Sequence, residues 1–204
     1  MFSGIIESLG RIEKIETENT NLHFYVSCDF LNEIHIDQSI AHNGVCLTVV
    51  EKDDKNYKVT AIKETLVKSN LGLLKAGDHI NLERSVSAAM RMDGHFVQGH
   101  VDTTAICKEV KEENGSWYYT FNISDKSSAN LMVNKGSITV NGVSLTLVDP
   151  ANDQFSVAII PFTHENTNFK YIKAGTTVNI EFDVMGKYVI KYLDSIRDSL
   201  MTRM

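Results

Sequence analysis

Proline and cysteine are scarce in this chain of 204 residues, and both shortages narrow its organisation. The two prolines, Pro150 and Pro161, leave no proline-rich linker that would separate domains. The three cysteines, Cys28, Cys46 and Cys107, are odd in number and form no CxxC pair. A disulfide framework is therefore not expected, and a reducing, cytoplasmic location is the simpler expectation.

Signals for membranes, nucleic acids and common cofactors are missing as well. No apolar run approaches the roughly 18 residues of a membrane span, and the first residues lack the basic region of a signal peptide. The net charge of −6 argues against a nucleic-acid partner. There is no P-loop, no GxGxxG and no Ser-His-Asp order. His95 and His100 have no third ligand nearby, which argues against a metal site.

An internal repeat organises the chain. The run Asn43-Gly44-Val45-Cys46-Leu47-Thr48 returns as Asn141-Gly142-Val143-Ser144-Leu145-Thr146, at an offset of 98 residues. The same ungapped offset pairs further residues: Ser39 with Ser137, Thr65 with Thr163, Lys75-Ala76-Gly77 with Lys173-Ala174-Gly175, Asn81 with Asn179 and Glu83 with Glu181. We infer a tandem duplication.

Each copy is rich in strand patterns. Residues 22–26, 57–62 and 78–84 are predicted strands, residues 64–74 a short helix, and the two Asn-Gly pairs tight turns. With about six short strands, each copy should close into a small antiparallel barrel. The predicted fold is mainly β: two tandem six-stranded Greek-key-type barrels, in residues 1–97 and 98–186, with a C-terminal α-helix in 187–204.

The tail has its own pattern. Val189, Leu193, Ile196 and Leu200 recur at spacings of four, three and four, which predicts an amphipathic helix with a narrow apolar seam. Two interpretations are open: the helix packs on its own barrel, or it joins a short bundle between subunits.

A duplicated barrel predicts two pockets of similar shape. Cys46, Leu47 and Thr48, like Ser144, Leu145 and Thr146, fall beside a tight turn, where amides and a threonine hydroxyl can bind the edge of a flat heterocycle. The plainer interpretation is that threonine favours strands and that the turn only sets the hairpin register. The copies also differ: Cys46 corresponds to Ser144, and aligning Gly4 with Gly99 sets His100 against Ile5. Two pockets with different catalytic groups suit a reaction between two molecules in different roles.

Several segments together resemble riboflavin synthases from residue 1 to the tail. They are Met1-Phe2-Ser3-Gly4-Ile5-Ile6, Ala41 to Val49, Lys63-Glu64-Thr65-Leu66, Asn70-Leu71-Gly72, Gly94 to Asp102 and Asn141 to Thr146. The resemblance implies conversion of two 6,7-dimethyl-8-ribityllumazine molecules into riboflavin and a ribitylamino-pyrimidine by transfer of a four-carbon unit. It implies no metal or redox cofactor. It further implies a homotrimer held by C-terminal helices, with the active site between the first barrel of one subunit and the second barrel of its neighbour. Association with lumazine synthase is left open.

Site residues follow from the resemblance position by position. The first pocket is expected to use Gly4, Ile5, Ile6, Ser39, Cys46, Leu47, Thr48, Thr60, Ala61, Ile62, Lys63, Glu64 and Thr65. The second is expected to use Gly99, His100, Val101, Lys135, Ser144, Leu145, Thr146, Ile160, Pro161, Phe162, Thr163, His164 and Glu165. Phe162 and His164 stand where the family varies, so we expect changed packing there and an unchanged reaction.

The expected reaction gives roles to three of these residues and to Asp183. A positioned base can remove a proton from the acidic lumazine methyl group, while the partner molecule is activated by adding a nucleophile. We assign His100 and Ser144 to proton handling, Cys46 to the acceptor-side pocket and Asp183 to support of Ser144. The main rival function is a non-catalytic binder like the lumazine proteins, whose second pocket is degraded; here Ser144, Lys135 and Thr163 are intact. A flavin reductase would need a nicotinamide domain, which the sequence does not contain.

Overall fold

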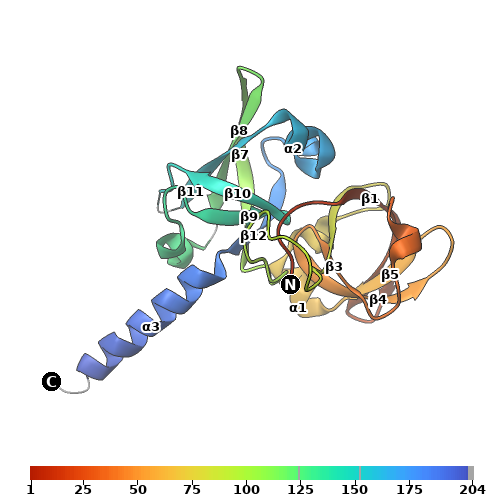
Figure 1. Cartoon of the computed structure of the whole chain (residues 1–204), viewed down its shortest axis with the longest axis horizontal. Helices are drawn as coiled ribbons and strands as arrows, with labels where there is room; N and C mark the ends of the chain where they lie inside the picture. The colour runs from red at the N-terminus through yellow and green to blue at the C-terminus, as the bar shows by residue number, and fades with distance from the viewer. Residues whose placement is uncertain (124, 152, 202–204) are drawn as a thin grey trace.

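The computed structural model describes residues 1–123, 125–151 and 153–201, and it contains two closed barrels of six antiparallel strands (Figure 1). The first barrel runs in the order β1-β2-β5-β4-β3-β6. Its strands are β1 (Ser8–Glu18), β2 (Asn21–Ser27), β3 (Ser39–His42), β4 (Val45–Lys52), β5 (Tyr57–Ala61) and β6 (His79–Arg84). Strands β2, β5 and β6 confirm the strands predicted at residues 22–26, 57–62 and 78–84.

The second barrel repeats this topology, in the order β10-β11-β8-β7-β12-β9. Its strands are β7 (Thr103–Glu113), β8 (Ser116–Ile123), β9 (Ser137–Val140), β10 (Val143–Val148), β11 (Gln154–Ile159) and β12 (Thr177–Phe182). In both barrels alternate side chains point inward, so that each encloses an apolar core; Tyr57 and Val59 lie in the first and Phe121 and Phe155 in the second. The predicted fold class is confirmed.

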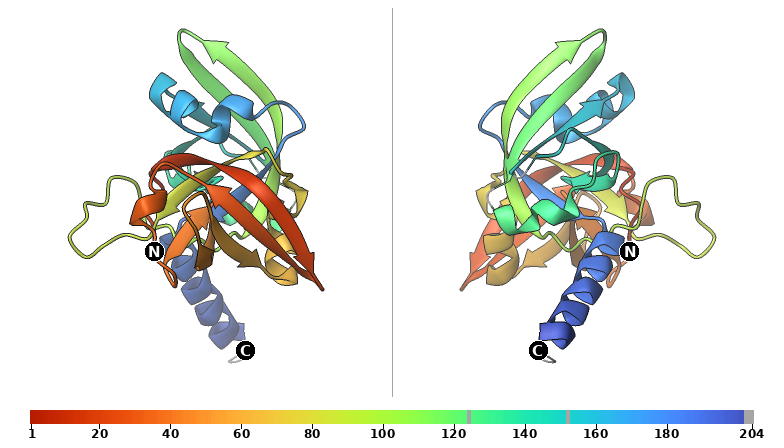
Figure 2. Two further views of the ribbon diagram at one scale, coloured as in Figure 1. Left: turned by 90° about the vertical axis from the view of Figure 1, so that its right-hand side faces the viewer. Right: turned by 90° about the vertical axis from the view of Figure 1, so that its left-hand side faces the viewer.

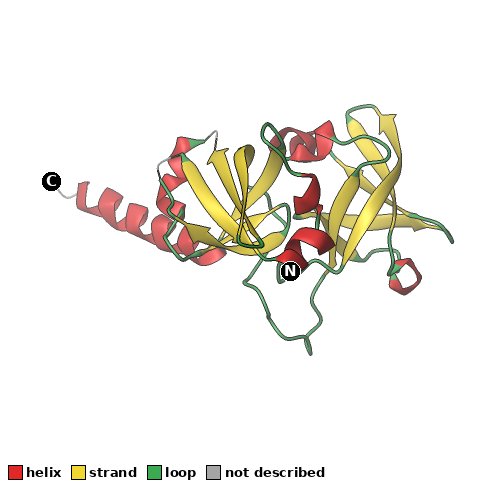
Figure 3. Ribbon diagram, turned by 90° about the horizontal axis from the view of Figure 1, so that it is seen from above, coloured by secondary structure: helices red, strands yellow, loops and turns green. Residues whose placement is uncertain are grey.

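Short helices connect the strands at equivalent places (Figure 3). These are α1 (Lys63–Lys68), α2 (Pro161–Asn166) and the 3-10 turns η1 (Leu31–Glu33), η2 (Asn70–Leu73), η3 (Lys126–Leu131) and η4 (Asn168–Tyr171). The helix predicted at residues 64–74 is therefore α1 followed by η2. None of the helices in the described part of the chain is long and apolar enough to span a membrane.

The barrels meet where the two Asn-Gly turns touch. Asn43 and Gly44 have φ of 47° and 78°, and Asn141 and Gly142 have 47° and 82°, which confirms left-handed hairpin turns. A Cβ on Gly44 would lie 2.8 Å from the backbone nitrogen of Gly142, so only glycine allows the two turns to approach this closely.

Buried asparagine side chains tie the barrels together around these turns. The Asn81 Nδ2 group donates to the Asn141 carbonyl at 2.9 Å, and the Asn179 Nδ2 group donates to the Asn43 carbonyl at 2.8 Å. The carboxamide oxygen of Asn179 in turn accepts from the backbone N–H of Asn70 at 2.6 Å. Because the repeated asparagines bond across the interface in both directions, the barrels are related by approximate two-fold symmetry and have a fixed mutual orientation.

The C-terminal helix α3 (Val184–Met201) leaves the second barrel and projects away from it (Figures 1 and 2). It begins three residues before the expected position 187, and residues 202–204 of the predicted helix lie outside the described residues. Its first turn is held by an ion pair of 2.6 Å between Lys187 and Asp102. Beyond that turn the seam is exposed: Leu193 is 57% accessible and Leu200 60%. Of the two interpretations, packing along its own barrel is not observed.

Candidate active site

The first pocket lies on the outside of the first barrel, where β4 meets α1. It is a cavity of about 230 Å³. Its wall combines Cys46 from β4, Glu64 and Thr65 from α1, and the segment Gly99-His100-Val101 from the start of the second repeat. Strand alternation explains the place of Cys46, because Val45 and Leu47 point into the barrel core while Cys46 between them points outward.

The second pocket is the counterpart of the first on the second barrel. It has a volume of about 150 Å³ and is lined by Ser144 from β10, Phe162 and Thr163 from α2, and the segment Gly4-Ile5-Ile6 from the start of the chain. Both pockets therefore have the same construction: a strand that follows an Asn-Gly turn, a short helix and a chain segment from the other repeat.

The assignment of the glycine segments to the pockets was wrong, because the two segments are exchanged. We expected Gly4 to Ile6 in the first pocket and Gly99 to Val101 in the second. In the structure the Ser144 N–H donates to the Gly4 carbonyl at 2.8 Å, and the Cys46 N–H donates to the Gly99 carbonyl at 2.9 Å. Ile6 accordingly packs on the core of the second barrel and Val101 on the core of the first. Each repeat supplies one wall of the other repeat's pocket.

Gly4 and Gly99 lie so close to the other barrel that only glycine fits at these positions. Gly4 and Gly99 have φ of 80° and 79°, in the left-handed region that L-residues rarely adopt. A Cβ on Gly4 would lie 2.5 Å from the Ser144 Cβ, and one on Gly99 would lie 2.6 Å from the Cys46 Cβ. The sequence predicted these glycines as site residues, and the structure explains why they have no side chain.

Ser144 is hydrogen-bonded to a histidine that sequence reasoning set aside. Its Oγ lies 2.7 Å from His95 Nδ1, and His95 Nε2 lies 3.2 Å from Thr139 Oγ1. Burial lowers the pKa of His95 below its ordinary value, and the nearby charge of Asp183 partly opposes this. A neutral imidazole beside a hydroxyl can accept its proton. No local pattern marks His95, because its partners lie more than 40 residues away in the chain.

Asp183 acts on this pair through charge rather than contact. Its carboxylate accepts the Met185 N–H at 3.0 Å in the first turn of α3, and its negative charge favours the protonated form of His95. No hydrogen bond joins Asp183 to Ser144 among the described residues, so support of Ser144 by Asp183 stays a prediction, and it would have to act through the imidazole.

The first pocket contains a different pair of groups. Cys46 presents a half-buried thiol, and His100 presents an exposed imidazole. The backbone N–H of His100 donates to Glu181 at 3.0 Å. The equivalent of His100 in the second pocket is Ile5, which is 45% accessible. The two pockets thus share their architecture and differ in their titratable groups.

Not every expected residue lines a cavity. The expected residues that line one are Gly4, Ile5, Ile6, Cys46, Glu64, Thr65, Gly99, His100, Val101, Ser144, Phe162 and Thr163. Sequence reasoning missed Val45, Lys68, Ser69, Val143, Asn166 and Thr167 on the same walls. Ser69 and Thr167 occupy equivalent places in the two pockets, and each hydroxyl donates to the carbonyl four residues earlier at 2.7 Å.

The remaining expected residues are not among those that line the two cavities, and their part in binding stays a prediction. Leu47 and Ala61 are buried in the first core, Ser39 pairs with Thr48 farther along β3 and β4, and Thr60 Oγ1 lies 2.9 Å from His23 Nδ1. Ile62, Lys63, Ile160, Pro161 and Glu165 are exposed around α1 and α2.

Lys135 and Thr146 are also exposed, and Leu145 is partly buried against the second core. His164 stacks on Trp117 with ring centroids 3.9 Å apart, so this position packs against the barrel. The changed packing expected at Phe162 and His164 stays a prediction.

Comparison with known proteins identifies the family. The Lumazine binding domain model matches residues 3–85 and 98–183, one match for each barrel. The riboflavin synthase of Bacillus subtilis is 38% identical over 200 residues, covering 98% of this chain and 93% of that protein. The chain belongs to the riboflavin synthase family. The Schizosaccharomyces pombe member is 36% identical over 197 residues, covering 96% of this chain and 95% of that protein.

Solved structures extend the likeness of the fold. LumP complexed with riboflavin superposes with a TM-score of 0.83 at 22% identity, covering 89% of this chain and 99% of that one. LumP complexed with 6,7-dimethyl-8-(1'-D-ribityl) lumazine gives a TM-score of 0.80 at 21% identity, covering 89% and 98%. At this level of identity the likeness concerns the fold alone.

Proposed function

We propose that this chain is a riboflavin synthase, which transfers a four-carbon unit between two molecules of 6,7-dimethyl-8-ribityllumazine. The products are riboflavin and 5-amino-6-(D-ribitylamino)uracil. The observation that carries the proposal is the pair of equivalent pockets with unlike polar groups, Cys46 with His100 in one and Ser144 with His95 in the other. Two molecules of one substrate that play different roles in a reaction need two pockets of the same shape with different reactive groups.

The polar pairs supply the proton transfers that the reaction needs. His95 is held neutral by burial and lies beside the Ser144 hydroxyl, so this pair can remove or return a proton in the second pocket. His100 and Cys46 are assigned to the partner molecule in the first pocket. Fixing two rings against each other supplies the proximity that a bimolecular step lacks, which contributes up to roughly 7–11 kcal/mol in favourable cases.

We further propose a homotrimer in which neighbouring subunits bring unlike pockets together. Two features support this. The cavities of about 230 and 150 Å³ lie below the roughly 300 Å³ at which small-molecule sites begin, so a second surface would complete each one. The α3 seam, with Leu193 and Ile196 exposed, also needs a covering partner. A cytoplasmic location and an association with lumazine synthase stay predictions.

Turnover tests the proposed function directly. Purified protein is incubated with the lumazine alone, and riboflavin is followed by its absorbance. We expect one riboflavin for every two lumazines consumed, with no added cofactor. Lumazine that binds at two sites per chain but is never consumed would contradict the proposal.

A non-catalytic lumazine- or flavin-binding protein is the second candidate. It is compatible with the same fold, because LumP complexed with riboflavin superposes with a TM-score of 0.83, but the fold alone does not separate the two functions. Equilibrium dialysis against riboflavin separates the two functions in combination with turnover. Binding without turnover would favour the binding protein, while turnover with two sites per chain supports the synthase.

A further inference from the structure

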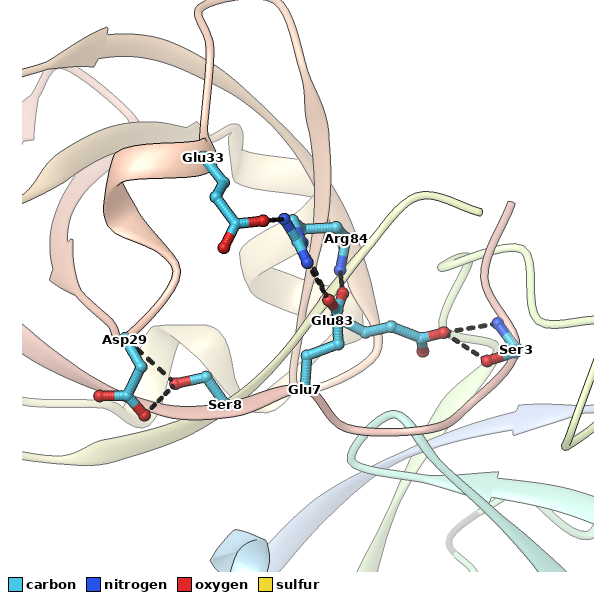
Figure 4. A network of polar contacts seen from close by, with 7 residues as sticks. All are labelled: Ser3, Glu7, Ser8, Asp29, Glu33, Glu83 and Arg84. Atoms are coloured by element: carbon cyan, nitrogen blue, oxygen red, sulfur yellow. Dashed lines mark hydrogen bonds and ion pairs between the residues drawn. The ribbon is translucent and has the colours of Figure 1, made fainter. Parts of the chain in front are cut away.

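The N-terminal crossing segment, residues 3–7, is attached at both ends to the last strand of its own barrel (Figure 4). At one end the buried Glu83 carboxylate accepts the Ser3 N–H and hydroxyl, both at 2.7 Å, and the Gly4 N–H at 2.9 Å. At the other end Glu7 accepts the Arg84 backbone N–H at 2.6 Å and the Arg84 guanidinium, also at 2.6 Å. Glu83 and Arg84 are neighbours in β6 that point in opposite directions, so one strand holds both ends of the segment.

The central crossing segment, residues 98–102, has the same attachment in the second repeat. Glu181 accepts the backbone N–H groups of Gln98, Gly99 and His100 at 2.7, 3.0 and 3.0 Å. Asp102 accepts the Phe182 N–H at 2.9 Å. Glu181 and Phe182 are neighbours in β12, as Glu83 and Arg84 are in β6.

The middle of each segment, by contrast, lies on the other barrel. Gly4 bonds to Ser144 and Ile6 packs on the second core, whereas Gly99 bonds to Cys46 and Val101 packs on the first core. Each glutamate is therefore rooted in one barrel, and the amides that it holds form a wall of the other barrel's pocket.

Burying the carboxylates of Glu83 and Glu181 costs free energy of desolvation, which the hydrogen bonds from these amides offset. Glu83 is 1% exposed and Glu181 is 2% exposed. Neither makes an ion pair of 4.0 Å or less with a described basic side chain, so backbone N–H groups, with the Ser3 hydroxyl at Glu83, supply the hydrogen bonds that each carboxylate receives. Three donors that converge on one rigid acceptor fix the position of a segment with far less freedom than packing alone.

We propose that Glu83 and Glu181 are positioning residues that act crosswise: Glu83 sets the geometry of the second pocket, and Glu181 sets that of the first. The inference rests on the proposed function only in that the pockets bind the lumazine and riboflavin rings. It adds that the ligand site of each barrel is controlled from the strand of the other, so substituting one glutamate disturbs the distant pocket more than its own.

The test compares Glu83→Gln with Glu181→Gln in the full-length chain. Matched controls are Tyr57→Phe and Tyr119→Phe, which remove one buried hydroxyl hydrogen bond from the first and second barrel without touching either crossing segment. Riboflavin is the probe. Trp117, the one tryptophan of the chain, stacks on His164 in α2, the helix that lines the second pocket, and therefore serves as a fluorescence reporter for that pocket. Equilibrium dialysis counts both sites.

We expect Glu83→Gln to weaken riboflavin binding at the second pocket at least about tenfold, because an amide cannot accept all the hydrogen bonds of a carboxylate. The first pocket should change less than about twofold. Glu181→Gln should do the reverse, and the tyrosine variants should shift neither pocket selectively. The inference is overturned if each glutamine variant weakens the pocket of its own barrel, or both pockets equally.

Two further measurements keep the inference decidable. Ser3→Ala removes a single hydrogen bond to Glu83 from outside the barrel, and we expect a smaller loss confined to the second pocket even if Glu83→Gln does not fold. Hydrogen–deuterium exchange needs no ligand. Glu83→Gln should speed exchange only at the Ser3 and Gly4 amides, and Glu181→Gln only at the amides of Gln98, Gly99 and His100. If the unaltered protein binds no riboflavin, the proposed function fails, while unchanged exchange in both variants refutes the crosswise positioning itself.

Discussion

Replacing His95 by asparagine tests the polar pair of the second pocket. His95 Nδ1 lies 2.7 Å from Ser144 Oγ, and Nε2 lies 3.2 Å from Thr139 Oγ1. For Nδ1 to accept the serine proton, the imidazole hydrogen must sit on Nε2 and point to Thr139. Asparagine preserves polarity and approximate reach, but it cannot take up a proton.

A positioned general acid–base group contributes about 10²–10⁴-fold to a rate, so we expect the single-turnover rate of His95→Asn to fall at least about 100-fold, close to 2.7 kcal/mol in the barrier. Thr139→Val should lower the single-turnover rate about tenfold, because it removes only the hydrogen bond that keeps the imidazole hydrogen on Nε2. Combining Ser144→Ala with His95→Asn should cost little more than either alone, because groups that act as a unit are not additive.

The pH profile gives a second, independent readout. Burial lowers the pKa of His95 below its ordinary value, so the imidazole is neutral at pH 7 and the rate should fall only as the pH drops below about 6.5. His79→Asn is the control, since His79 stacks on Tyr171 at 4.9 Å, away from both pockets. An unchanged single-turnover rate in His95→Asn, or an acid limb that persists in it, would refute this role.

Three further predictions concern the fold and the assembly. Burial lowers the pKa of His42 from 6.5 to about 4, so the folded state binds fewer protons, and about 3 kcal/mol of stability should be lost between pH 6.5 and 4. The free energy of unfolding, measured with urea at several pH values in that range, should fall less steeply with decreasing pH in His42→Gln than in the unaltered protein. The exposed His35→Gln should show no such change. Asn179→Ala leaves the Asn43 carbonyl and the Asn70 N–H without partners and should cost about 2–6 kcal/mol in urea unfolding, and a cost below 1 would contradict the interface. Leu193→Glu should reduce the mass in sedimentation from a trimer to about 22.9 kDa, and an unchanged trimer would exclude the α3 seam as the contact.

Most of the fold could be predicted from the internal repeat, because the repeated patterns depend on residues that are close together in the chain. Strand alternation and the two Asn-Gly turns are short-range signals, and an ungapped offset of 98 residues requires that both copies close in the same way. The tail helix was equally visible, since its apolar spacing does not depend on a partner. Whether that seam would pack on its own barrel was not predictable, because spacing alone does not say what covers a face.

The exchange between the barrels was not visible, and the reason is physical. Aligning Gly4 with Gly99 gives an offset of 95 residues instead of 98, so the sequence shows that the crossing segments shift against the barrels. It does not show where they go. Their destination depends on Ser144 and Cys46 as hydrogen-bond donors across the interface and on the room left by glycine, both of which are properties of the assembled pair. His95 was missed for the same reason.

This exchange also explains how one duplicated unit acquires two different sites. If each pocket were built from one repeat alone, making the pockets unlike would require changes within a barrel itself. Because one wall of each pocket comes from the other repeat, the presence of His100 in place of Ile5 changes the first barrel's pocket without altering a strand of that barrel. His95 then brings an imidazole to Ser144 from the connection between the barrels. The scaffold can stay symmetric while the two substrates meet different groups, which a reaction between two identical molecules demands.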